Sequence, residues 1–146
     1  MSKKASAAVL VKPGLMETRE FDLAQPEKGA ALCRVLSVGV CGTDKHSYRG
    51  ETVQYKGTEN EIDLPFPIIQ GHEIAMEIVA IDEEAAQNLS FDGDYLKVGD
   101  RITICPDVVC GKCWYCKNMP SYPWCEHLQF SYGNMRSCND GHHLYG

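Results

Sequence analysis

The chain has 146 residues, of which 44% are hydrophobic and 23% are charged, and this length and composition fit one domain around one buried core. A formal net charge of −6 argues against broad electrostatic binding to nucleic acid or to an anionic membrane. The apolar stretch Ala7 to Val11 is too short for a signal-peptide core, and no segment approaches the roughly 18 apolar residues of a membrane span. We therefore expect a cytoplasmic protein, in which clustered thiols bind metal more often than they form disulfides.

Short strands separated by turn residues are the main pattern along the chain. The predicted strands are Ser6–Val11, Leu15–Phe21, Ala30–Val40, Gly71–Asp82 and Val98–Cys105. Pro13-Gly14 closes the first two into a hairpin, and Glu83–Lys97 is an exposed polar connection with a turn at Asp92-Gly93. The fold class is mainly β, a small barrel or folded sheet, because strands at this spacing must close or cover their edges.

Gly39 and Gly42 bracket Cys41 at the end of the third predicted strand. Glycine lets a backbone turn sharply, so the pattern places Cys41 at a strand-to-loop junction. A short helical turn is expected directly after it.

The segment from Pro106 to Gly146 has few aliphatic residues and contains four closely spaced cysteines: Cys110, Cys113, Cys116 and Cys125. Gaps of two residues let neighbouring thiolates converge on one ion at about 2.3 Å, and Gly111 permits a tight turn that points amides toward sulfur. Buried free thiols, disulfides or an iron–sulfur cluster are the alternatives. The spacing favours a closed tetrahedral zinc site, which holds the lobe of about residues 106–126 in shape and performs no chemistry, because no coordination position stays open.

A second constellation is spread along the chain, with CGTDKH at Cys41–His46 and GHE at Gly71–Glu73. Each motif is weak alone, since a lone cysteine after a strand usually packs in the core and a lone histidine is usually a satisfied surface or buried group. Together they supply a thiolate and an imidazole, which is half of a zinc site. An incomplete protein ligand set leaves room for water or substrate, as catalytic zinc requires.

Four motifs in this order, CGTDKH, GHE, VGDRI at Val98–Ile102 and the four-cysteine lobe, resemble the N-terminal catalytic domain of zinc-dependent medium-chain alcohol and polyol dehydrogenases. The similarity runs from about Ala7 to the end of the chain. It implies a single GroES-like domain over residues 1–146, a partly open β-barrel with a zinc-stabilised loop lobe and short helices. It also implies oxidation of a small-molecule alcohol to an aldehyde or ketone by NAD or NADP, with zinc as the Lewis acid.

The resemblance assigns metal roles to particular residues. Cys41 and His72 correspond to two ligands of the catalytic zinc, and Glu73 to the neighbouring carboxylate that approaches or replaces a ligand while water exchanges. Asp44 corresponds to the acid that hydrogen-bonds the ligating histidine and fixes its tautomer.

A proton path is implied as well. Thr43 corresponds to the hydroxyl that takes the substrate proton, and His46 to the far end of the relay that delivers it to solvent. The rival hypothesis is a stand-alone GroES-like zinc module with an interaction role. A co-chaperonin is disfavoured, because that function requires none of these motifs.

Three features depart from the family pattern. Glu51–Asp63 is longer than the usual connection and is expected to reshape the mouth of the substrate site, and the gap from Cys116 to Cys125 is one residue longer than the common seven. The family also has a further zinc ligand and a Rossmann nucleotide-binding domain beyond the point where Gly146 stands. We therefore expect the chain alone to be inactive, to hold the catalytic zinc weakly, and to be a monomer or a weak homo-oligomer.

Three cysteines lie outside both sets. Cys33 and Cys105 fall within strand patterns and are expected to be buried thiols without a metal role. Cys138 stands near His142 and His143, which are expected to be solvated.

Overall fold

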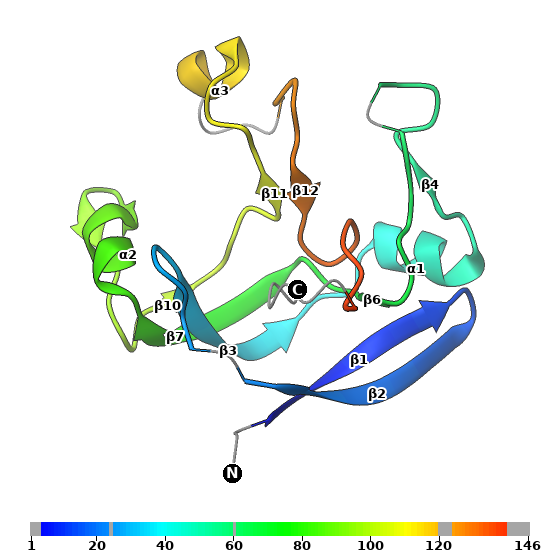
Figure 1. The fold of residues 1–146 in the computed structure, drawn as a ribbon, viewed down its shortest axis with the longest axis horizontal. Coiled ribbons are helices and arrows are strands. Elements are labelled where there is room, and N and C mark those ends of the chain that lie inside the picture. The colour runs from blue at the N-terminus through cyan, green and yellow to red at the C-terminus, as the bar shows by residue number, and fades with distance from the viewer. Residues whose placement is uncertain (1–3, 24, 60, 120–123, 140–146) are drawn as a thin grey trace.

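Two three-stranded antiparallel sheets form the body of the structure, a computed structural model that describes residues 4–23, 25–59, 61–119 and 124–139 (Figure 1). The first sheet has the order β2 (Leu15–Asp22), β1 (Lys4–Lys12) and β6 (Ile68–Ile69). The second has the order β10 (Arg101–Ile102), β7 (Ile74–Ile81) and β3 (Ala31–Val38). The predicted mainly β class is therefore confirmed.

The predicted N-terminal hairpin is present and slightly longer than expected. Its turn contains Gly14 with φ +75°, a left-handed conformation that glycine adopts at no steric cost. Val9 and Leu10 of β1 are fully buried and pair with β6. Leu10 packs with Leu64 and Ile68 into the apolar core, so the first sheet contributes most of the hydrophobic stabilisation near the N-terminus.

The pairing of β3 with β7 joins two segments that are far apart in the sequence. Ala31 pairs with Ile81 and Val38 with Ile74, with two irregularities of register between these ends. The strands predicted over Ala30–Val40 and Gly71–Asp82 are thus confirmed with tighter bounds. The end of β3 consequently lies beside the start of β7.

The strand predicted over Val98–Cys105 is reduced to the two residues of β10. Gly99 before it has φ +94°, and its amide donates to the Ile78 carbonyl at 2.8 Å. Cys105 lies beyond β10 and is exposed, so the expectation that it is a buried strand thiol is wrong. Cys33, within β3, was also expected to be buried and is partly buried.

The connection between β7 and β10 is more regular than the sequence suggested. It contains the helix α2 (Glu83–Asn88) and a small hairpin of β8 (Ser90–Phe91) and β9 (Asp94–Tyr95). Asp82 caps α2 by accepting from the Glu84 amide at 2.9 Å, which satisfies one of the free donors of the first turn. The predicted turn is confirmed, with φ +51° at Asp92 and +89° at Gly93.

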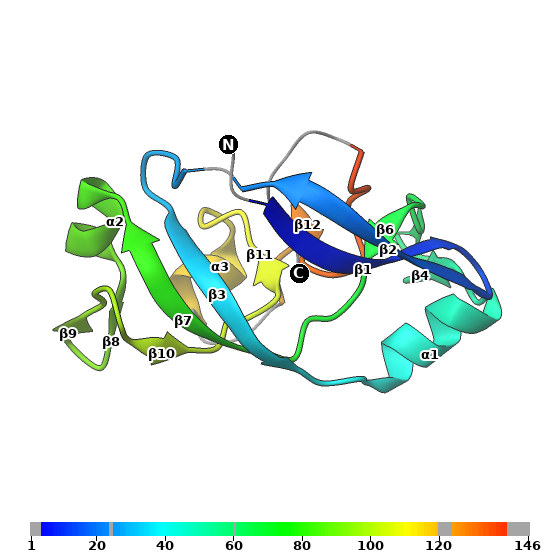
Figure 2. The same ribbon diagram turned by 90° about the horizontal axis from the view of Figure 1, so that it is seen from below.

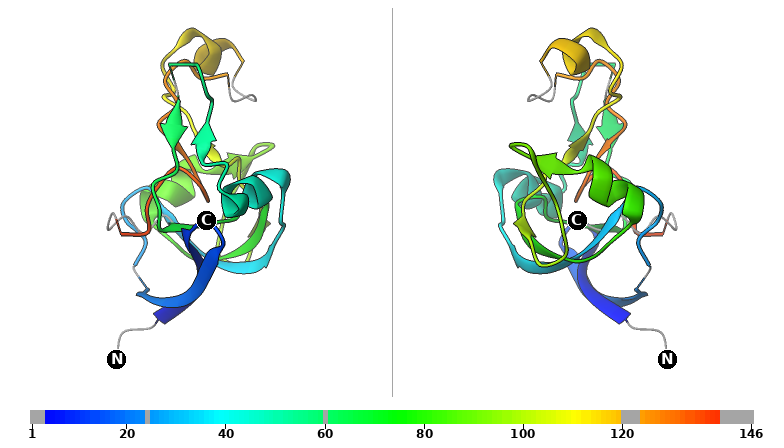
Figure 3. Two further views of the ribbon diagram at one scale, coloured as in Figure 1. Left: turned by 90° about the vertical axis from the view of Figure 1, so that its right-hand side faces the viewer. Right: turned by 90° about the vertical axis from the view of Figure 1, so that its left-hand side faces the viewer.

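Two arms project from the same side of the body (Figures 1 and 3). One is the hairpin of β4 (Val53–Gln54) and β5 (Ile62–Asp63), and the other is the pair β11 (Asp107–Val108) and β12 (Phe130–Ser131), which carries α3 (Trp114–Asn118) at its tip. Helix α1 (Gly42–Arg49) follows β3 at one end of the molecule (Figure 2). None of the described helices is both long and apolar enough to span a membrane.

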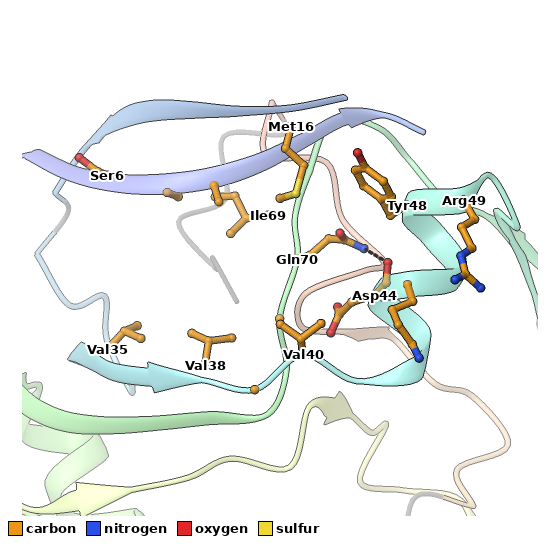
Figure 4. A pocket seen from close by; sticks show the side chains of 15 residues that line it. Ser6, Met16, Val35, Val38, Val40, Asp44, Tyr48, Arg49, Ile69 and Gln70 are labelled. Carbon is orange, nitrogen blue, oxygen red and sulfur yellow. Dashed lines mark hydrogen bonds between the residues drawn. The ribbon is translucent and has the colours of Figure 1, made fainter. Parts of the chain in front are cut away.

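The two sheets do not close into a continuous barrel. Within the described strands no backbone pairing links them, and a cavity of about 690 Å³ lies between β1 and β3 (Figure 4). Its apolar lining includes Met16, Val35, Val38, Val40 and Ile69. The partly open barrel predicted from the sequence is therefore observed.

Gly71 and Gly133 are in direct backbone contact, which fastens the segment after β12 to the start of β7. A Cβ atom at Gly133 would overlap the backbone of Gly71. Both residues have a positive φ, +82° at Gly133 and +111° at Gly71. Only glycine fits such an approach. The contact holds the chain against the residue that precedes His72.

We predict that Gly133→Ala lowers the free energy of unfolding by about 3 kcal/mol or more, because it adds steric overlap to an unfavourable φ. Gly57→Ala is the matched control. Gly57 also has a positive φ, +79°, but nothing lies near its Cβ position, so that substitution should cost only about 1 to 2 kcal/mol. Urea unfolding of both variants under reducing conditions with zinc measures the difference, and equal losses would show that the contact is unimportant.

Candidate metal sites

The four thiols of the lobe converge on one point between β11, α3 and the segment before β12. Their ligand atoms all lie within 4.8 Å of one another. Cys113 Sγ lies 3.4 Å from Cys116 Sγ, which in turn lies 4.0 Å from Cys110 Sγ. A tetrahedral zinc with sulfur at about 2.3 Å has sulfur–sulfur edges of about 3.8 Å, so the cluster has the size of a four-thiolate zinc site.

Backbone amides surround the sulfur atoms. The amide of Cys113 donates to Cys110 Sγ at 3.4 Å, and that of Cys116 donates to Cys113 Sγ at 3.5 Å. Cys125 Sγ accepts from the amides of Cys110 and His127 at 3.2 and 3.3 Å. These donors require the tight turns predicted at the cysteine pairs, and Gly111 has φ +69° as that prediction implies.

The pKa values of three of these thiols differ because each sulfur has different amide donors, different neighbouring thiols and a different degree of desolvation. Hydrogen bonds from the Lys112 and Cys113 amides lower the pKa of Cys110 to about 6, and the Cys116 amide lowers the pKa of Cys113. Desolvation and the neighbouring thiols raise the pKa of Cys116 to about 12. Several negative charges cannot gather at this spacing without a cation, so the cluster fits a divalent metal that deprotonates every ligand.

The lobe has little apolar packing of its own. Cys113 and Cys125 are its buried residues, whereas Trp114 and Trp124 are 60% and 58% exposed. At its base β11 pairs with β12, where Phe130 is buried and the Arg136 guanidinium lies 3.9 Å from the centre of its ring. A metal ion would supply the cross-link that a hydrophobic core supplies elsewhere.

Cys41 and His72 meet at the junction of β3, α1 and β7. Cys41 Sγ lies 3.2 Å from His72 Nε2. A zinc bound to one sulfur and one imidazole nitrogen in tetrahedral geometry separates the two atoms by about 3.6 Å, so a small adjustment opens the pair around an ion. The thiolate and imidazole that the sequence set apart by 31 residues are thus brought together.

Asp44 lies beside this pair and also shapes the helix. Its carboxylate accepts from the Cys41 amide at 2.9 Å, which caps the first turn of α1. One of its oxygens lies within 4.8 Å of Cys41 Sγ and a His72 ring nitrogen. His72 Nδ1 is buried and has no hydrogen-bond partner among the described residues, so the implied bond from Asp44 to His72 is not made in this arrangement.

Glu73 is exposed and lies against Gly39. The Gly39 amide donates to the Glu73 carbonyl at 2.7 Å, and a Cβ at Gly39 would overlap the Glu73 carboxylate. Neither Gly39 nor Gly42 has a positive φ, although the predicted junction at Cys41 with a helix directly after it is observed. Gly39 provides the space for β3 to approach the residue next to His72.

The residues of the implied proton path lie along α1. Thr43 is partly buried in the first turn, and its carbonyl accepts from Ser47 Oγ at 2.9 Å. His46 is exposed, and its Nδ1 lies 2.6 Å from Glu51 Oε2. Glu51 was not predicted as a partner of His46, although Gly50 before it signals a helix end.

An open cleft of about 480 Å³ adjoins His72 and Glu73, between the end of β3, the start of β7 and the segment after β10. Thr103, Ile104 and Pro106 line its other wall. The larger cavity of Figure 4 is bordered by Asp44 and Gln70 and shares no lining residue with this cleft. His72 therefore borders a cleft large enough for a small molecule.

The fold thus brings together two groups of possible metal ligands, one of four thiols and one of a thiol, a carboxylate and an imidazole. The family model "Alcohol dehydrogenase GroES-like domain" matches residues 27–140. The chain therefore belongs to the family of alcohol dehydrogenase GroES-like domains. Its predicted resemblance to the zinc-dependent medium-chain alcohol and polyol dehydrogenases is confirmed.

Relatives and solved structures agree with this assignment. The chain is 34% identical over 119 residues to L-threonine 3-dehydrogenase from Pyrococcus horikoshii, covering 80% of this chain and 30% of that protein. It is 34% identical over 114 residues to an uncharacterized zinc-type alcohol dehydrogenase-like protein from Escherichia coli, covering 77% and 29%. The structure of an alcohol dehydrogenase from Thermotoga maritima matches with TM-score 0.76 and 33% identity over 99% of this chain and 36% of that one. The chain thus spans about 30% of the length of these curated relatives.

Cys138 belongs to neither metal group, and its amide donates to the Pro67 carbonyl at 2.9 Å. The neighbouring His142 and His143 lie outside the described residues. No further cluster of possible metal ligands occurs in residues 4–23, 25–59, 61–119 and 124–139.

We predict that Cys110 is the first thiol of the metal-free lobe to react with iodoacetamide near pH 7. The amide hydrogen bonds that lower its pKa to about 6 keep it as thiolate, the nucleophilic form, whereas Cys116, with a pKa near 12, should react last. Exposed Cys105 is the internal reference, and peptide mass spectrometry measures each rate. Zinc should protect all four lobe thiols and leave Cys105 reactive; equal rates at Cys110 and Cys116 without zinc would contradict the prediction.

Proposed function

We propose that this chain is the zinc-binding catalytic domain of an NAD(P)-dependent dehydrogenase that oxidises an alcohol or polyol to an aldehyde or ketone. One observation carries the proposal: Cys41 Sγ and His72 Nε2 lie 3.2 Å apart beside an open cleft. A thiolate and an imidazole leave coordination positions free for substrate, as catalytic zinc sites do. A stand-alone module would need only the closed four-thiolate site.

In the proposed site, Cys41 and His72 hold the metal and Glu73 stands by as an exchangeable carboxylate. A zinc ion there would supply Lewis-acid activation of the alcohol oxygen. Asp44 fixes the first turn of α1 through the Cys41 amide, so that Thr43 in the same turn is held beside the metal pair. Thr43 accepts the substrate proton and His46 passes it to solvent.

The chain supplies one domain of the proposed enzyme, and a Rossmann domain binds the nicotinamide cofactor. The substrate is a small alcohol that reaches the cleft beside His72. The four-cysteine lobe over about residues 106–126 acts as a structural zinc site. The cytoplasmic location and the inactivity of the isolated chain are parts of the same proposal.

We predict that the zinc-loaded chain contains two zinc ions, of which a mild chelator removes one. Four thiolates chelate strongly, whereas two protein ligands hold an ion weakly. His72→Ala should lower the initial zinc content to one per chain. Cys33→Ala, which removes a thiol outside both clusters, should leave two, and metal analysis by mass spectrometry measures each value. Two chelation-resistant zinc ions in the wild-type chain would contradict weak binding at the second site.

The enzyme proposal is tested by joining the chain to its nucleotide-binding domain and measuring alcohol-dependent reduction of NAD or NADP. His72→Ala should lower kcat/KM by more than about 100-fold, since even residues that only support a metal ligand cost 10- to 100-fold. Cys33→Ala should leave the rate unchanged. A joined protein that binds zinc at both sites and oxidises none of a panel of alcohols and polyols would overturn the proposal.

A further inference from the structure

The C-terminal end of α1 brings Glu51 back over His46. Gly50 has φ +94°, and its amide donates to the Ser47 carbonyl at 3.2 Å, while the Glu51 amide donates to the His46 carbonyl at 3.0 Å. This pair of bonds is a Schellman motif, which places the residue after the glycine beside the residue five positions earlier. The backbone alone thus places Glu51 and His46 together.

The side chains at these two positions usually form a hydrophobic contact in such a motif. Here they form a hydrogen bond of 2.6 Å between His46 Nδ1 and Glu51 Oε2, with side chains 58% and 62% exposed. Exposed ion pairs add little to stability. A polar pair at a position that normally packs apolar groups therefore calls for a role other than holding the helix end.

The helix end is also fixed from outside. The Gly14 amide donates to the Tyr48 carbonyl at 2.8 Å, and Tyr48 Oη donates to the Gly14 carbonyl at 3.2 Å. The turn between β1 and β2 therefore braces the last turn of α1 independently of Glu51. Loss of the Glu51 carboxylate should leave the helix in place.

We propose that Glu51 is a positioning residue for His46, a role that rests on the proposed function. A carboxylate oxygen only accepts hydrogen bonds, so the neutral imidazole facing it carries its proton on Nδ1. Nε2 is then the free acceptor. A histidine held in this tautomer takes a proton at Nε2, which gives an imidazolium paired with Glu51, and then loses the Nε2 proton to water, which restores the Nδ1–H tautomer. Glu51 thus keeps Nε2 as the atom that accepts the proton in each cycle.

The variants Glu51→Leu and Glu51→Asp test this role. Leucine restores the usual hydrophobic contact of the motif and removes the acceptor, whereas aspartate keeps a carboxylate. Glu20→Leu is the matched control. Glu20 lies on β2, away from α1, its side chain is similarly exposed, at 64%, and it forms an ion pair with Lys4 of β1. Circular dichroism and thermal unfolding check that each zinc-loaded variant keeps the fold.

The first readout is the ¹⁵N spectrum of His46 in the zinc-loaded 146-residue chain, at a pH where the ring is neutral. We expect the Nδ1–H tautomer in the wild type. In Glu51→Leu the ratio of the Nδ1–H to the Nε2–H tautomer should fall at least about tenfold, because a bond to a charged acceptor is lost. In Glu51→Asp the ratio should recover. Glu20→Leu should match the wild type. An Nε2–H tautomer in the wild type, or no change in Glu51→Leu, overturns the proposal.

The second readout is alcohol oxidation by the chain joined to its nucleotide-binding domain. Glu51→Leu should lower kcat by about tenfold with KM unchanged, a fraction of what general acid–base catalysis contributes. A changed tautomer with an unchanged kcat also overturns the positioning role. Failure of the proposed function is seen separately, as a joined wild-type protein that oxidises no alcohol while the tautomer of His46 still depends on Glu51.

Discussion

The antiparallel pairing of β3 with β7 is the constraint on which the proximity of Cys41 and His72 depends. Antiparallel neighbours place the end of one strand beside the start of the other, and the register from Ala31–Ile81 to Val38–Ile74 brings the residues after β3 next to those before β7. The bond from the Gly39 amide to the Glu73 carbonyl, at 2.7 Å, extends this pairing beyond the strands. Two motifs with no local relation thereby contribute a thiol and an imidazole that lie 3.2 Å apart.

The four-cysteine lobe, in contrast, depends on contacts between residues close together in the sequence. Its thiols are neighbours in the sequence, and the turns between them aim amides at sulfur with no help from the body of the protein. Hydrogen bonds from backbone amides lower the pKa of Cys110 and Cys113, while desolvation and the neighbouring thiols raise the pKa of Cys116. A cation resolves this conflict by stabilising every thiolate at once, so a bound metal ion would stabilise the folded lobe.

This difference explains what could be predicted from the sequence. The N-terminal hairpin, the thiol cluster and the turn at Asp92-Gly93 depend on short-range spacing, and all three are observed. The space that Gly39 provides for Glu73 was not predicted, because a glycine that makes room for a distant strand looks in the sequence like one that makes a turn. The contact between Gly71 and Gly133 was not foreseen for the same reason. Helix α2 was not predicted, because the segment Glu83–Lys97 is polar and shows no helical pattern of apolar residues. The start of α2 depends on the Asp82 cap.

The site residues also divide into those predicted from local spacing and those that depend on distant contacts. The proximity of Cys41 and His72 required a family resemblance, since no local pattern connects them. Glu51 was noticed only as the start of a long segment, because a histidine and a glutamate five residues apart meet only when the helix ends between them. Gly50 gives that signal, yet its consequence for the side chains appears only once the hydrogen bonds of the helix end are drawn.

The long segment after Glu51 can vary without disturbing the chemistry beside it. The Leu64 amide donates to the Thr52 carbonyl at 3.0 Å, which closes the β4–β5 hairpin at its base, so residues 53–63 form an arm that begins and ends at one place. The groups of the proposed proton path precede that closure and are all fixed by α1. Residues added to or removed from the arm would leave the spacing of Thr43 and His46 unchanged, because that spacing is set by a single helix.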